Sequence, residues 1–124
     1  MNAMLVVGLG GFAGSVARYR LGGLVLHHSL GSRFPWSTLA VNLVGCLLVG
    51  LFAGWSEHRA ALWPNLRLLL ITGFCGGFTT FSAFGLETLY LLRRDAVATA
   101  ALNVLVSAAG GVIGVWLGWK VSHI

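Results

Sequence analysis

Four long apolar segments restrict this chain to very few folds. They cover about residues 3–26, 36–55, 66–92 and 96–119, and short polar joints separate them. Each segment has the roughly 20 residues that an α-helix needs to cross a hydrocarbon core about 30 Å thick. Inside lipid every backbone polar group needs a partner within the protein, and a helix provides one. The sequence therefore predicts an all-α membrane protein with four transmembrane helices, in a single domain over residues 1–124.

The charge of the chain limits the kinds of partner that it can bind. Only 9% of the residues are charged, against about 25% in a soluble domain. The formal net charge is +5, which favours anionic lipid headgroups or an anionic substrate as partners. No run of basic residues exceeds Arg93-Arg94, so we do not expect nucleic acid binding.

The basic residues divide almost evenly between the two sides of the membrane. One side would hold Arg59, Arg67 and Lys120, and the other Arg33, Arg93 and Arg94. The positive-inside rule then barely selects an orientation. Either one orientation prevails weakly, or the chain inserts both ways and pairs with itself as an antiparallel, dual-topology homodimer. A paired heterodimer is the third alternative.

Uncharged polar residues interrupt three of the four segments. Thr38 and Asn42 are four residues apart, and so are Asn103 and Ser107, which places each pair on one helix face. The third segment carries Thr79, Thr80 and Ser82. These groups either hold helices together by hydrogen bonds or line a path for an ion. The acidic residues Glu57 and Asp95 lie in joints and Glu87 lies near the end of the third segment, whereas a cation path usually needs a buried carboxylate. An anion path is therefore the favoured alternative.

The string "GFCGGFTTFSAF" at residues 73–84 predicts a helix that is broken near its middle. Gly73, Gly76 and Gly77 each weaken a helix by about 1 kcal/mol relative to alanine. An unwound turn at membrane depth must be buried or face a cavity, where its carbonyls can bind a cation. Phe81 and Phe84 follow, three residues apart on one face. They either pack together or turn their positive ring edges toward an anion.

Glycines four residues apart recur along the chain and predict close contacts between helices. The sets are Gly10/Gly14, Gly50/Gly54, Gly73/Gly77 and Gly110/Gly114/Gly118.

Three motifs resemble the CrcB/Fluc fluoride channels over essentially the whole chain. They are "GSVARY" at 14–19, "STLAVNLVGC" at 37–46 and "GFCGGFTTFSAF" at 73–84. The resemblance implies a fluoride-selective channel in the cell (inner or plasma) membrane that lets cytoplasmic fluoride leave passively. It also implies an antiparallel homodimer with two pores and a structural sodium ion at its centre.

The resemblance assigns roles residue by residue. The backbone carbonyls of Gly76 and Thr79 would bind sodium, and Arg18 would stand in the vestibule. Phe81, Phe84 and Asn42 would contact fluoride, and the candidate hydroxyls along the path are those of Thr38, Thr80, Ser82 and Ser107. Ala83 and Gly111 depart from the family, which often has threonine and serine there, and each departure removes a hydroxyl from the region of the path.

Other functions fit the sequence less well. A small multidrug transporter needs a carboxylate in its first helix, and the first segment has none, only Arg18 and Arg20. A non-transporting accessory subunit would use the polar residues for assembly alone. A metal enzyme could use His27 and His28, but no carboxylate or cysteine completes such a site. We therefore expect the chain not to be an enzyme.

Overall fold

The computed structural model describes residues 2–58 and 64–124, and every regular element within these ranges is helical. The first two segments form α1 (Ala3–His28) and α2 (Trp36–His58), and the last forms α6 (Val97–Ser122). The third segment is divided into α3 (Pro64–Arg67), the π-helix η2 (Leu68–Cys75), α4 (Gly76–Phe78) and α5 (Phe81–Arg93).

Three helical stretches in the described residues are long and apolar enough to cross a membrane. They are Trp36–His58, Pro64–Arg93 and Val97–Ser122. Helix α1 is not among them, although it has 26 residues; it carries Arg18 and Arg20. Its crossing of the membrane therefore remains a prediction.

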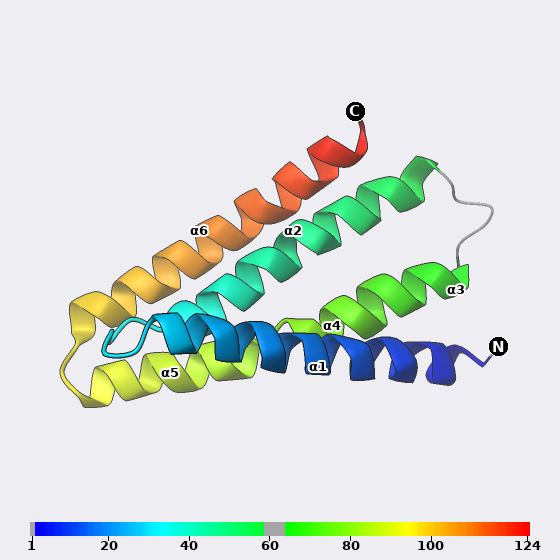
Figure 1. Ribbon diagram of the computed structural model, residues 1–124. Coiled ribbons are helices and arrows are strands. Elements are labelled where there is room, and N and C mark those ends of the chain that lie inside the picture. The colour runs from blue at the N-terminus through cyan, green and yellow to red at the C-terminus, as the bar shows by residue number, and fades with distance from the viewer. Residues whose placement is uncertain (1, 59–63) are drawn as a thin grey trace.

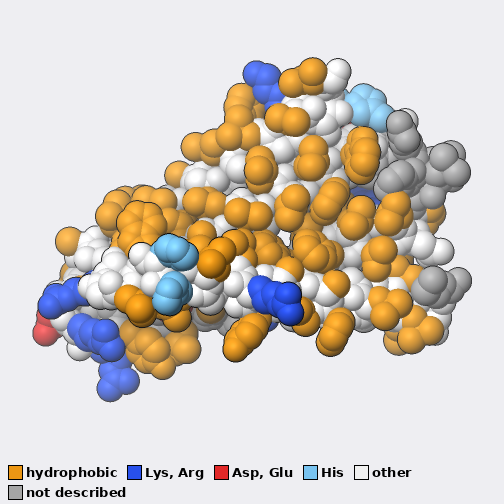
Figure 2. Space-filling view, viewed as in Figure 1, with side chains coloured by type: hydrophobic (Ala, Val, Ile, Leu, Met, Phe, Trp, Pro, Cys, Tyr) orange, Lys and Arg blue, Asp and Glu red, His pale blue; other side chains and the backbone are white. Residues whose placement is uncertain are grey.

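The helices form two groups that lie side by side (Figure 1). Helix α6 packs along α2, while α1 packs along η2 and α4. Helix α5 continues the second group beyond the break and connects to α6 through a turn at Asp95, whose φ is 58°. Figure 2 shows hydrophobic side chains over most of the visible face, as expected for a surface that contacts lipid.

Glycines allow both groups to pack closely, as the four-residue spacing predicts. A methyl group on Gly14 would collide with the backbone carbonyl of Phe74, and one on Gly50 would collide with that of Val115. A methyl group on Gly77 would lie within about 3 Å of the backbone of Gly11. Small residues thus bring α1 against η2 and α4, and α2 against α6.

The glycines of the third segment do not unwind it. Gly73 lies in η2, and Gly76 and Gly77 lie in α4. The sequence predicted a break near the middle of this segment, within the string at residues 73–84; Gly73 and Gly77 stay helical because their backbones pack against that of α1. The helical residues stop instead at Phe78 and resume at Phe81.

Candidate functional site at the interrupted third segment

Thr79 and Thr80 separate α4 from α5. Their backbones are extended, with φ and ψ of −80° and 155° at Thr79 and −146° and 112° at Thr80. Asn42 on α2 contacts this segment twice: its Nδ2 donates to the carbonyl of Thr80 at 2.9 Å, and its Oδ1 accepts from the N–H of Thr80 at 2.8 Å. One amide side chain therefore satisfies both the N–H and the carbonyl of Thr80.

The break also changes the hydrogen bonding of its neighbours. In a continuous helix the N–H of Thr80 would donate to the carbonyl of Gly76, but here it donates to Asn42. The hydroxyl of Thr79 donates back to the carbonyl of Cys75 at 2.8 Å. The hydroxyl of Thr80 accepts from the N–H of Ala83 at 3.2 Å and so caps α5. The carbonyl of Gly76 is thereby released from its helical partner.

A cavity of about 540 Å³, which we name the central cavity, brings together most of the predicted site residues. Its lining comes from α2, the break, α5 and α6. The predicted residues in it are Asn42, Thr79, Thr80, Phe81, Phe84 and Ser107. The ring centroids of Phe81 and Phe84 are 5.5 Å apart, and 85% of Phe81 is exposed. The break and the phenylalanine pair thus belong to one site.

A second cavity of about 330 Å³, the Arg18 cavity, is lined by residues of α1 and α2, by Thr80 and by the start of α5. Arg18, Thr38 and Thr80 line it, and Thr80 also lines the central cavity. Ala83, one of the two departures from the family, lines it as well. Ser82 belongs to neither lining; its Oγ lies 3.3 Å from Oγ1 of Thr80. The predicted hydroxyls therefore do not form a single row.

Glu87 is a further functional candidate, to which the sequence assigned no role. It lies in the middle of α5, within the last two turns of the third segment. The hydroxyl of Thr38 donates to its Oε1 at 2.7 Å, while its Oε2 is buried and has no hydrogen-bond partner among the described residues. The sequence could have indicated that Glu87 lies near the candidate site, because Glu87 follows Phe84 by three residues and shares its helix face.

A second hydrogen-bonded group connects α6 to α5. Ser107 donates to Oδ1 of Asn103 at 3.3 Å, and Nδ2 of Asn103 donates to the hydroxyl of Thr88 at 3.0 Å. That hydroxyl in turn donates to the carbonyl of Phe84 at 2.7 Å. Asn103 is only 2% exposed. The sequence paired Asn103 with Ser107 correctly but did not identify Thr88.

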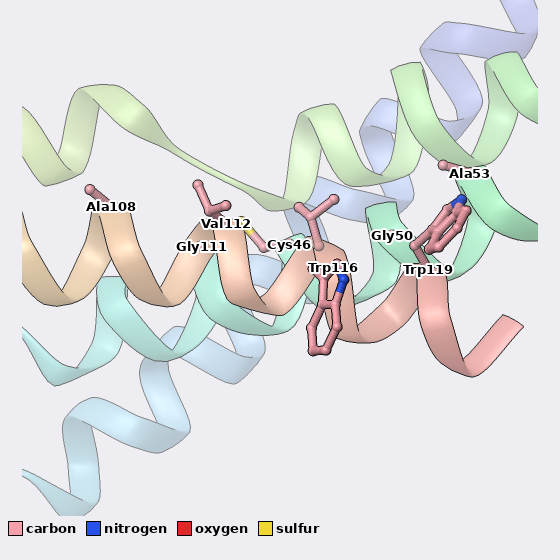
Figure 3. Close-up of a pocket in the computed structure, with 9 residues that line it drawn as sticks. Cys46, Gly50, Ala53, Ala108, Gly111, Val112, Trp116 and Trp119 are labelled. Carbon is pink, nitrogen blue, oxygen red and sulfur yellow. The ribbon is translucent and has the colours of Figure 1, made fainter.

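An apolar groove of about 610 Å³ runs between α2 and α6 (Figure 3). Figure 3 shows Cys46 of α2 beside Gly111 of α6, with Trp116 and Trp119 farther along the groove. A methyl group on Gly111 would lie 3.4 Å from the sulfur of Cys46. Gly111, the other departure from the family, therefore faces this groove, whereas Ser107 faces the central cavity.

The histidine pair gives no support to a metal enzyme. His28 bonds through Nδ1 to the carbonyl of Leu24 at 2.9 Å, and the rings of His27 and His28 meet edge to face. Among the described residues no three histidine, cysteine or acidic side chains gather as metal ligands.

Comparison with known proteins identifies the family. Residues 5–119 match the family model of "CrcB-like protein, Camphor Resistance (CrcB)". The chain is 49% identical to the fluoride-specific ion channel FluC of Methylobacillus flagellatus over 97% of its own length and 94% of the relative's. It is 45% identical to the channel of the same name from Chlorobium phaeobacteroides, over 98% and 94%. Together with the helices that can span a membrane, these matches show that the chain is a multi-pass membrane protein and belongs to the CrcB-like family.

Proposed function

We propose that this chain forms a fluoride-selective ion channel that lets cytoplasmic fluoride leave the cell passively through its inner or plasma membrane. The lining of the central cavity carries the proposal. It presents an amide, hydroxyls and two phenyl rings, and none of the described residues that line it is acidic. The curated relatives bear the name of fluoride-specific channels.

The lining has donors suited to a small, strongly hydrated anion. Asn42 uses one of its two amide N–H groups on Thr80, and the other is available to a bound ion. The positive ring edges of Phe81 and Phe84 add weak electrostatic attraction. Such donors replace part of the hydration shell and still let the ion go, as conduction demands. An inside-negative potential favours exit by about 2.3 kcal/mol per charge per 100 mV.

We infer that the working form is an antiparallel homodimer with two pores along the subunit interface. Two observations support it. Phe81 is 85% exposed in the single chain, so a site that uses its ring edge is open on one side. The basic residues are balanced between the two sides, so neither orientation is strongly favoured. A second copy would close the site, and lipid would cover the remaining apolar surface.

We also propose a structural sodium ion at the dimer centre, held by backbone carbonyls of Gly76 and Thr79. The local structure fits such an ion: the carbonyl of Gly76 has lost its helical donor to Asn42, and Gly76 itself is exposed. Unwound carbonyls at the C-terminal end of a half-helix are the groups that bind sodium in membrane transporters. Because one chain offers only a few such oxygens, the antiparallel copy would supply the others. The ion would neutralise the repulsion between carbonyls from the two chains.

No catalytic step belongs to this function. The chain is not an enzyme, as the sequence predicted, because its family is one of ion channels.

Fluoride efflux from liposomes tests the proposal. Purified protein is reconstituted into liposomes loaded with potassium fluoride, valinomycin is added, and a fluoride electrode follows release. Chloride-loaded liposomes serve as the control for selectivity. We expect fast fluoride release and no chloride release. If folded dimers in sodium buffer release no fluoride, the channel function is wrong and an accessory role takes its place.

A further inference from the structure

A chain of three hydrogen bonds leads from the central cavity into the space between α6 and α5. It begins at Ser107, which lines the cavity, and passes through Asn103 and Thr88 to the carbonyl of Phe84. Neither Asn103 nor Thr88 is among the residues that line the cavity. This series of hydrogen bonds therefore connects a hydroxyl in the cavity to two side chains that would not touch an ion.

The donor in each of these hydrogen bonds follows from the last acceptor in the series, the carbonyl of Phe84. A carbonyl only accepts, so the hydroxyl of Thr88 must give its single proton to Phe84, 2.7 Å away. Thr88 can then only accept from Asn103, which requires the amide nitrogen to face it. The amide oxygen consequently faces Ser107, and Ser107 must donate to it.

This direction determines what Ser107 shows to the cavity. Its one proton points to Asn103, so its oxygen presents lone pairs to the cavity, and lone pairs repel an anion. The hydroxyl must rotate before it can donate to fluoride. Its bond to Asn103 is 3.3 Å long, against about 2.7–2.8 Å for a typical O–H···O bond, so it is weak and easily exchanged.

We propose that Asn103 is a positioning residue that competes with the permeating anion for the proton of Ser107. The inference rests on the proposed function as a fluoride channel. Because the anion must displace Asn103 from that proton, it binds the central cavity more weakly than a free hydroxyl would allow. Weak binding is what lets an ion leave a narrow site. Thr88 contributes by fixing the orientation of the Asn103 amide.

The variant Asn103→Leu removes the competing acceptor and tests this role. The measurement is the fluoride concentration that gives half-maximal efflux from liposomes. We expect it to fall about fivefold, which corresponds to the loss of one competing hydrogen bond. The same substitution is then made in a Ser107→Ala background, where no proton is left to compete for and no such fall is expected. An unchanged value in Asn103→Leu, or an equal fall in both backgrounds, overturns the proposal.

The variant Thr88→Val is a second test that keeps the size and shape of the side chain. Without the Thr88 hydroxyl the Asn103 amide can turn its nitrogen to Ser107 and release the serine proton. We expect the half-maximal concentration to fall about twofold, again only where Ser107 is present. If Asn103→Leu does not fold, an unchanged value in Thr88→Val overturns the proposal by itself.

Efflux by the unsubstituted protein distinguishes a failure of the proposed channel function from a failure of the proposed role of Asn103. Normal efflux with unaffected variants overturns only the role of Asn103. Absence of fluoride efflux from the unsubstituted, folded protein overturns the proposed function and this role together.

Discussion

Asn42 on α2 binds the backbone of Thr80 with both atoms of its amide, at 2.9 Å and 2.8 Å. The two residues are 38 positions apart in the chain. This contact replaces the helical hydrogen bonds lost at the break, and it places an amide next to the central cavity. Asn42 thus has a structural task in addition to its proposed contact with fluoride.

Replacing Asn42 by aspartate should weaken its contact with Thr80 and abolish its proposed contact with fluoride. A carboxylate has no donor for the Thr80 carbonyl, and its negative charge repels an anion in the cavity. We expect fluoride efflux to fall by at least about tenfold, and the free energy of unfolding to fall by roughly 1–3 kcal/mol. Liposome efflux and thermal denaturation in detergent measure the two effects. The control variant Asn42→Ala loses both hydrogen bonds and adds no charge, whereas Asn42→Asp keeps an acceptor for the N–H of Thr80. Undiminished efflux in Asn42→Asp would exclude Asn42 from the pore.

Replacing Phe81 by isoleucine should separate flux from stability. The ring is 85% exposed within the chain, so its loss should change the stability of the single chain by less than about 0.5 kcal/mol. Fluoride efflux should nevertheless fall clearly, because the ring edge is lost from the cavity. Size-exclusion chromatography tests whether the variant keeps the oligomeric state of the unsubstituted protein, and the electrode measures efflux. Efflux equal to that of the unsubstituted chain would remove Phe81 from the mechanism.

Replacing Thr38 by valine should destabilise the protein through Glu87. The change leaves both carboxyl oxygens of Glu87 without a partner among the described residues. The expected loss is about 2–3 kcal/mol, measured by thermal or chemical unfolding. Ser37→Ala is the matched control, because Ser37 donates only to the neutral carbonyl of Gly22, at 2.8 Å. Equal losses in the two variants would contradict a special role for the Thr38–Glu87 contact.

Two glycines of α1 should respond oppositely to alanine. A methyl group on Gly14 collides with the carbonyl of Phe74, whereas one on Gly8 has nothing within 4 Å. We expect Gly14→Ala to cost about 1–3 kcal/mol, and Gly8→Ala to be neutral or to stabilise by up to about 1 kcal/mol. Melting temperatures of the two variants in the same detergent make the comparison. Similar stabilities would show that α1 does not pack on η2 as closely as the structure has it.

If the proposed sodium site is present, removal of sodium should lower the stability of the proposed dimer. An ion that binds only the folded dimer stabilises it in proportion to the logarithm of its concentration. The melting temperature should therefore rise with sodium chloride and not with N-methylglucamine chloride at equal ionic strength. Identical curves in the two salts would argue against a sodium site at Gly76 and Thr79.

The helical segments and the residues that share a helix face could both be predicted from the sequence. Both follow from local regularities: a run of apolar residues long enough to cross lipid, and a repeat of 3.6 residues per turn. For this reason Asn103 and Ser107, four residues apart, were paired correctly. The close contacts at Gly14 and Gly50 were predicted by the same kind of local pattern.

Which helix faces meet, and where the third segment leaves the helix, depends on contacts between distant parts of the chain. Glycine composition indicated weak points at Gly73, Gly76 and Gly77, but all three stay helical, and Gly73 and Gly77 pack against the backbone of α1. The interruption falls at Thr79 and Thr80, where Asn42 supplies the replacement hydrogen bonds. The hydroxyls of Thr38 and Ser107, grouped together by sequence, face different cavities. Helical periodicity acts over a few residues, whereas these contacts depend on how distant helices cross.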